Sequence, residues 1–223
     1  MRTRTKAVVG VGAALVVVGG VAAVFGPGWY ADRAEEAAED EPSLSASAAP
    51  AQDAESDGTW TVSDGSFAGY RVDEVLQGED VTVTGRTDDV SGQVTIAEGQ
   101  VTDASVEVKV ATIATDSDRR DDYFRGTAIQ AEQFPTATFE LTEPATLEEG
   151  ATEVELVGDL TVRGETRPVT VDAEVGGDGA GALQVVGSVP VTFADFGIDA
   201  PNLGFVKVED TGSVEFSLEL AKG

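Results

Sequence analysis

The sequence predicts an all-β domain, an antiparallel barrel or sandwich of about eight strands that begins near Thr59. Three observations predict it. Apolar and polar residues alternate in a series of short stretches. Gly-rich turns such as 176–179 separate those stretches. The first 58 residues lack the pattern of a globular domain, and about 165 of the 223 residues remain, which is enough for one closed domain.

The alternation identifies the individual strands. Strict alternation means that one face of a strand is buried and the other is polar. The residues that mark the buried faces are Val81 and Val83; Val106, Val108 and Val110; Val154, Leu156, Leu160 and Val162; Val169, Val171, Ala173 and Val175; Leu183, Val185, Val189, Val191 and Phe193; and Val214, Phe216, Leu218 and Leu220.

One stretch, 118–132, interrupts the alternation. Asp118 could cap a helix start, with Asp121 three residues on, and Thr127 with Gln130 repeats the spacing. We therefore expect one or two short helices packed across the barrel, ended by Pro135.

The N-terminal region predicts a membrane anchor. Residues 1–6 carry three basic side chains and are expected to be a cytoplasmic tail. The uncharged run 7–26 would span about 30 Å as a helix, which suits a transmembrane signal-anchor. A cleaved signal peptide is the alternative, but its apolar run is usually shorter. The expected location is the cell membrane, single-pass, with the barrel (59–221) extracytoplasmic.

Between anchor and barrel, 27–58 is expected to be a disordered linker. It consists largely of Ala, Glu, Asp, Ser and Pro, and such a composition offers too little apolar surface to fold. A brief helix over 32–41 is compatible with it, and the remainder would be a spacer.

Composition excludes several functions. The net charge of −27 and the pI of about 4.1 argue against a nucleic-acid partner, which requires clustered basic residues. The chain has no Cys and no His, so thiol chemistry and the commonest general base and metal ligand are lacking. We expect no cofactor, no metal and no catalysis. The rival, an enzyme with a carboxylate pair in the barrel, would depend on acids such as Asp159 and Asp195.

Several motifs occur in a characteristic order. They are Trp60, Gly69-Tyr70-Arg71-Val72, Gly85-Arg86-Thr87, Asp116 with Arg120-Asp121, Phe134-Pro135, Gly158-Asp159-Leu160-Thr161, Arg167-Pro168-Val169 and Asp195-Phe196-Gly197. Together they resemble the YceI-like family over about residues 59–221. The resemblance implies a lipocalin-like barrel that holds a polyisoprenoid or another lipid chain.

The barrel interior is the expected site. Inward Val, Leu and Phe side chains would suit an isoprenoid or fatty amphiphile as ligand, whereas the same residues could instead form a filled core. The aromatic candidates for the cavity wall are Tyr70, Phe134, Phe139, Phe193, Phe196 and Phe205.

Arg120 and Asp121 form the most distinctive polar pair. In a structural role, Asp121 caps the helix and Arg120 pairs with an acid on a neighbouring strand. In a functional role, Arg120 or Arg119 meets a ligand headgroup at the barrel mouth. The sequence thus predicts a membrane-tethered lipid carrier, and the alternative is a non-catalytic scaffold barrel of the cell envelope without a lipid.

Overall fold

The computed structural model describes residues 32–33, 35–45, 49–50, 57–76, 78–147, 150, 152–177, 181–202, 204 and 206–223. The predicted anchor (7–26) and basic tail (1–6) lie outside the described residues. None of the helices in the described part has the length and apolar content needed for a membrane crossing.

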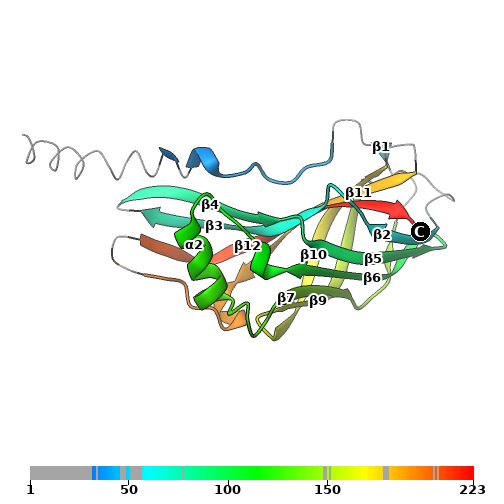
Figure 1. The fold of residues 1–223 in the computed structure, drawn as a ribbon. Helices are drawn as coiled ribbons and strands as arrows, with labels where there is room; N and C mark the ends of the chain where they lie inside the picture. The colour runs from blue at the N-terminus through cyan, green and yellow to red at the C-terminus, as the bar shows by residue number, and fades with distance from the viewer. Residues whose placement is uncertain are drawn as a thin grey trace, which may run out of the picture.

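Antiparallel strands make up nearly all of the described chain (Figure 1). Their bounds are β1 (Ala49–Pro50), β2 (Gly58–Val62), β3 (Phe67–Leu76), β4 (Glu79–Thr87), β5 (Val90–Ala97), β6 (Gln100–Lys109), β7 (Thr136–Leu141), β8 (Ala145–Thr146), β9 (Glu153–Val162), β10 (Glu165–Gly177), β11 (Ala182–Thr192) and β12 (Val206–Lys222).

Eight of these strands close a barrel within the described residues. The circuit runs β2–β5–β6–β7–β9–β10–β11–β12 and returns to β2, with every pair antiparallel. β2 pairs with only the last residues of β12, and β3 pairs with 206–217 along the same edge. The hairpin β3–β4 thereby lengthens the barrel wall beyond the end of β2. The predicted antiparallel barrel is confirmed.

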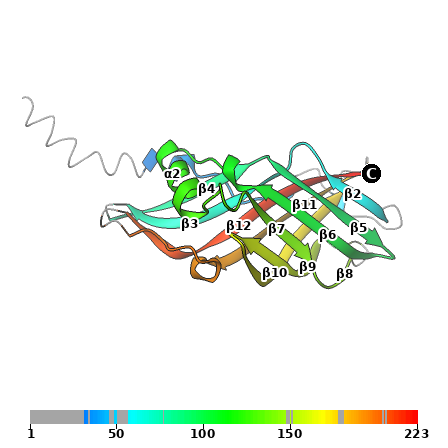
Figure 2. The same ribbon diagram turned by 60° about the horizontal axis from the view of Figure 1, so that its bottom comes forward.

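The interruption after β6 is helical, as the sequence predicts. It contains η2 (Val110–Thr112), α2 (Asp118–Tyr123) and the π-helical turn η3 (Phe124–Ala128), and α2 lies at one end of the barrel (Figure 2). Asp118 and Asp121 were both predicted to cap this helix, and both predictions are wrong. Ser117 occupies the N-cap position of α2, and no side chain caps the helix. A further short helix, η4 (Phe193–Phe196), takes the place of the expected end of β11.

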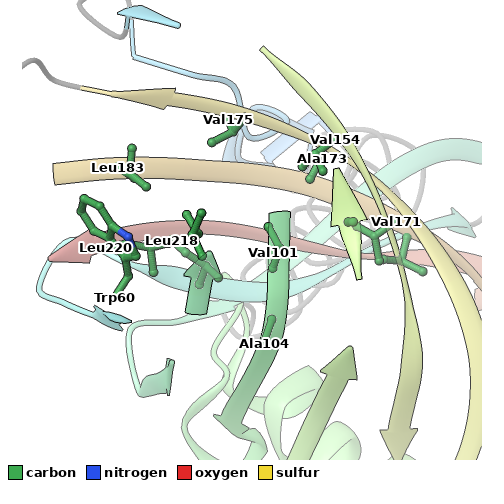
Figure 3. Close-up of a cluster of buried hydrophobic side chains, with 13 residues drawn as sticks. Trp60, Val101, Ala104, Val154, Val171, Ala173, Val175, Leu183, Leu218 and Leu220 are labelled. Atoms are coloured by element: carbon green, nitrogen blue, oxygen red, sulfur yellow. The ribbon is translucent and has the colours of Figure 1, made fainter. Parts of the chain in front are cut away.

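The opposite end of the barrel holds the main hydrophobic core (Figure 3). Trp60 on β2 is 2% exposed, and Leu220 on β12 is 1% exposed. Both belong to one cluster with Val101, Leu183 and Leu218. Lys222 places its ammonium 5.5 Å from the Trp60 ring centroid. This end, which we call the closed end, is therefore sealed by large apolar side chains.

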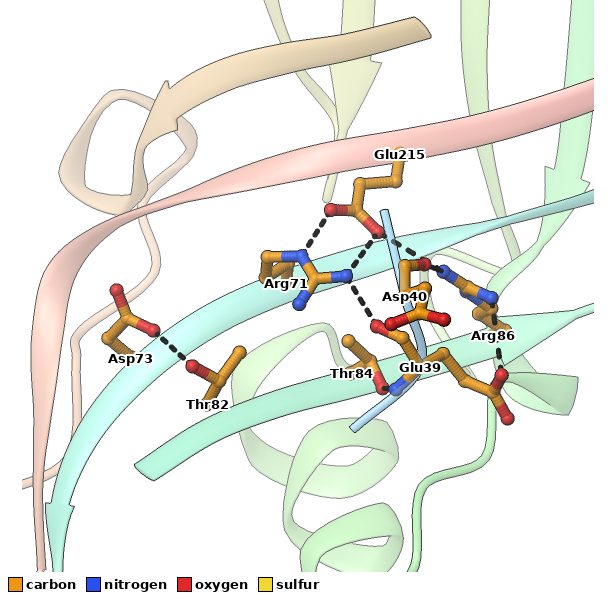
Figure 4. A network of polar contacts seen from close by, with 8 residues as sticks. All are labelled: Glu39, Asp40, Arg71, Asp73, Thr82, Thr84, Arg86 and Glu215. Atoms are coloured by element: carbon orange, nitrogen blue, oxygen red, sulfur yellow. Dashed lines mark hydrogen bonds and ion pairs between the residues drawn. The ribbon is translucent and has the colours of Figure 1, made fainter. Parts of the chain in front are cut away.

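Residues 35–45 correct the prediction of a disordered linker. This segment, the strap, lies along the outside of β3 and β4 (Figures 1 and 4). The backbone N–H of Glu39 donates to Thr84 Oγ1 at 2.9 Å, and Arg71 Nη2 donates to the carbonyl of Glu39 at 2.6 Å. Arg86 donates to the carbonyl of Asp40. Backbone groups make most of these bonds, so a composition without large apolar residues does not prevent the segment from docking.

Two glycines allow β3 and β4 to approach closely. A Cβ added at Gly69 would lie 1.9 Å from the carbonyl oxygen of Gly85, a backbone atom that cannot rotate away. We therefore expect Gly69→Ala to lower the free energy of unfolding by about 1–3 kcal/mol, measured by urea unfolding. Gly126→Ala is the control, because nothing lies within 4 Å of the added atom. Equal stability of the two variants would contradict the expectation.

Candidate functional site

A cavity of about 640 Å³ runs inside the barrel. Alternate residues of the strands point into it, because side chains in a strand alternate between the two faces. Its wall includes Val154, Leu156, Leu160 and Val162 of β9, and Leu183, Val185, Val189 and Val191 of β11. The volume lies in the range of about 300–1,000 Å³ that is usual for ligand pockets. Part of the interior is thus an open, apolar space that the hydrophobic cluster does not fill.

The cavity opens at the end of the barrel that carries α2. Among its described lining residues only Arg119 and Asp199 are exposed, and they mark the mouth. Arg119 belongs to α2, whereas Asp199 follows η4. The segment 117–129, here called the lid, contributes Ser117, Tyr123, Phe124 and Ile129 to the wall. An elongated guest would therefore enter between the lid and the segment after η4.

A buried ion pair joins the lid to the barrel wall. Glu74 on β3 faces the cavity and is 6% exposed, and its Oε1 lies 3.3 Å from Arg120 Nη2. Arg120 also pairs with Asp116. Two carboxylates thus hold one guanidinium, which has the structural role that the sequence suggests for Arg120.

Tyr70 lies beside this pair. Its ring stacks on Phe124 of the lid, with centroids 4.9 Å apart. Burial raises the pKa of the Tyr70 phenol far above its usual value, although nearby Arg120 lowers it somewhat. The phenol therefore remains neutral at physiological pH, so Tyr70 adds no charge to the cavity wall.

Asp121 holds the turn that precedes α2. It is buried, and its Oδ1 accepts hydrogen bonds from the backbone N–H of Thr115 at 2.9 Å and from the Thr115 hydroxyl at 2.8 Å. Arg125 Nη1 lies 3.9 Å from its other oxygen. Asp121 is not a lining residue, so its contacts shape the turn before α2 and do not reach a guest.

The aromatic candidates separate into three groups. Tyr70, Phe139, Phe193 and Phe196 line the cavity. Phe134 does not, because its ring covers the β9–β10 turn, where its Cε1 would be 2.6 Å from a Cβ on Gly164. Phe205 lies outside the described residues.

Sequence reasoning missed Glu74, the one buried acid on the cavity wall among the described residues. The signal was present, since Glu74 has the same parity as Val72 and Leu76 on β3. Asp159 and Asp195, the acids considered instead, are not among the lining residues. In the described part, no group of three or more His, Cys, Asp or Glu residues is placed to hold a metal ion.

Replacement of Arg120 tests the lid contact. We expect Arg120→Met to lower stability by about 1–3 kcal/mol, because it leaves Glu74 buried without a partner. Hydrogen exchange of the amides in 118–128 should accelerate. Arg167→Met is the control, since its pair with Glu165 lies outside the lid and is exposed, with 43% and 53% of the two side chains accessible. Equal exchange rates in both variants would contradict this role.

Comparison with known proteins shows which family the chain resembles in sequence. Residues 60–220 match the model of the YceI-like domain. A UPF0312 protein of Vibrio parahaemolyticus is 36% identical over 110 residues, which cover 44% of this chain and 54% of that protein. A UPF0312 protein of Pseudomonas aeruginosa is 33% identical over 99 residues, covering 42% and 50%. The matched regions thus span about half the length of these relatives.

Solved structures show the same fold at low identity. A polyisoprenoid-binding domain from Saccharophagus degradans has a TM-score of 0.59 and 17% identity, covering 74% of this chain and 99% of that one. BcnA of Burkholderia cenocepacia has a TM-score of 0.55 and 22% identity, covering 67% and 95%. Because the family model matches most of the chain, including every strand of the closed barrel, the protein belongs to the YceI-like family.

Proposed function

We propose that this protein is a membrane-tethered, extracytoplasmic lipid-binding protein that sequesters or carries a polyisoprenoid or another amphiphilic lipid. The observation that carries the proposal is the open apolar cavity of about 640 Å³. Each methylene that leaves water for such a space contributes about 0.8 kcal/mol. A long hydrocarbon tail would therefore bind by burial and shape alone.

Similarity to a lipid-binding protein supports a lipid as the ligand. One solved relative in fold is a polyisoprenoid-binding domain, and the cavity of the present chain suits a ligand of that kind. The wall also supports binding without chemistry, because its buried acid, Glu74, is held in an ion pair with Arg120. The chain also contains no His, the commonest general base, and no Cys, an intrinsically strong nucleophile.

At the mouth, Arg119 is the better candidate for a headgroup. Arg120 is occupied by Glu74 and Asp116. Arg119 is exposed at the rim of the cavity, and no ion pair joins it to another described residue. An anionic headgroup at the mouth would meet this guanidinium while the tail extends into the barrel.

Tethering is proposed from the sequence. The run 7–26 is long and apolar enough for a membrane helix, and the basic residues before it favour a cytoplasmic N-terminus. The barrel would then lie on the outer side of the membrane, within reach of lipids in the facing leaflet.

Native mass spectrometry of the full chain, released from mild detergent, tests the proposal. We expect an adduct that organic extraction removes and that lipid mass spectrometry identifies as an isoprenoid or fatty amphiphile. A chain that is folded and free of lipid, and that takes up none from added polyprenyl lipid, would support the scaffold alternative and overturn the carrier function.

A further inference from the structure

The chain enters the barrel at its closed end. β2 begins at Gly58, which pairs with Ile96 near the β5–β6 turn, and Trp60 pairs with Lys222 near the C-terminus. Trp60 itself belongs to the core that seals this end. A linker running straight from a membrane to β2 would therefore present the closed end to that membrane, with the mouth pointing away.

The strap carries the chain back along the barrel. β1 pairs with Gly176 and Gly177 at the end of β10, and the Ser45 N–H donates to Gln184 of β11 at 2.8 Å. Farther toward the N-terminus, Asp40, Glu39 and Glu35 contact successive positions of β4. Their partners are Arg86, Thr84 and the backbone N–H of Thr82, to which Glu35 Oε2 lies at 2.7 Å.

The strap begins level with the lid. Thr82 pairs with Asp73 in the β3–β4 ladder, and the next residue, Glu74, holds Arg120 of α2. Figures 1 and 2 agree, since in both views the blue segment starts beside α2, whereas β2 and the C-terminus lie at the other end. The strap therefore spans the barrel from closed end to mouth.

A buried charge cluster fixes the strap in place (Figure 4). Glu215 points outward from β12 by strand parity but is only 2% exposed, and it pairs with Arg71 at 2.5 Å and with Arg86 at 3.6 Å. Both arginines also donate to strap carbonyls. Each guanidinium thus bonds to a strand acid and to the strap at once, which favours one position of the strap.

We propose that the strap turns the barrel so that its mouth faces the membrane in which the chain is anchored, and that the partner of the mouth is the lipid surface itself. This inference rests on the proposed function, because it requires both the anchor and a lipid guest. Its own content is the orientation of the barrel.

Chain lengths show how much the strap shortens the tether between membrane and barrel. From Gly26 to Glu35 the chain is at most about 30 Å long, counted at roughly 3.5 Å per residue. Without the strap, the free linker from Gly26 to Gly58 could reach about 110 Å. The docked strap thus converts a long, non-directional tether into a short one that starts beside the mouth, and a lipid would cross little water between bilayer and cavity.

The absence of Cys allows a clean test with single-cysteine probes. A donor dye is placed at Asp118→Cys, exposed on the lid, or at Thr146→Cys, exposed on β8 near the closed end. The full chain is reconstituted into phosphatidylcholine vesicles that carry an acceptor dye on headgroups of both leaflets. We expect higher energy transfer from position 118 than from position 146.

Strap variants separate orientation from anchoring. Replacement of 35–45 by a Gly-Ser sequence of equal length should abolish the difference between the two probes. Glu36→Gln, at an exposed strap position, should preserve it. Equal transfer from both positions, in a chain that resists carbonate extraction and carries lipid, would overturn the orientation while the proposed function stands. A chain that carbonate removes from the vesicles would overturn both.

Discussion

Replacement of Glu215 by alanine is expected to lower the free energy of unfolding by about 3–5 kcal/mol. The carboxylate is 2% exposed and pairs with both Arg71 and Arg86, whose side chains are 18% and 20% exposed. Removing it leaves Arg71 without its ion-pair partner, and it leaves Arg86 with only the exposed carboxylate of Glu39, 3.6 Å away. Urea unfolding of the detergent-solubilised chain, followed by circular dichroism of the β-sheet, measures the loss.

Glu209→Ala is the matched control on the same strand. Its pair with Lys207 is exposed, with 48% and 57% of the two side chains accessible, so we expect a change within about 0.5 kcal/mol. The loss of stability in Glu215→Gln should lie between those of the two alanine variants, because the amide oxygen can still accept a hydrogen bond from Arg71. A Glu215→Ala protein as stable as Glu209→Ala would show that the cluster does not hold the strap.

The burial of Glu215 illustrates what the sequence could not show. Alternation along β12 places Glu215 on the outer face, where a charged residue is normally solvated. It is buried because the strap, more than 170 residues earlier, returns to cover that face. Composition indicated disorder for the strap, since it reports apolar side chains and not backbone carbonyls, and it is the carbonyls of Glu39 and Asp40 that bind the arginines.

The barrel strands, in contrast, could be predicted, because their signal is local in the sequence. Period-two patterns such as Val154–Val162 depend only on which face is buried, and they locate a strand without knowledge of its partner. The pattern cannot show whether the enclosed space is filled, because inward residues look the same around a core and around a cavity. The same alternation could have placed Glu74 on the inner face of β3, with Val72 and Leu76. Phe134 lies outside any alternating stretch, so its direction could not be predicted, and it packs on Gly164.

Phe139→Arg is expected to abolish lipid retention. Phe139 lies on β7 opposite Val106 of β6 and Leu160 of β9, both of which also line the cavity. An arginine there would bring a charge that cannot be deprotonated into an apolar space, and a hydrocarbon tail beside it would prevent its hydration. Lipid mass spectrometry of the purified variant, compared with the unchanged protein, measures the loss.

Two further variants separate loss of the cavity from loss of the fold. Glu140→Arg introduces the same side chain at the next, exposed position of β7 and should leave lipid content unchanged. Val106→Trp adds neutral volume to the cavity wall and should reduce lipid content while the barrel remains folded. If Phe139→Arg and Val106→Trp are both folded and both retain their lipid, the guest lies elsewhere, because a tail within the barrel could avoid neither the new charge nor the lost volume.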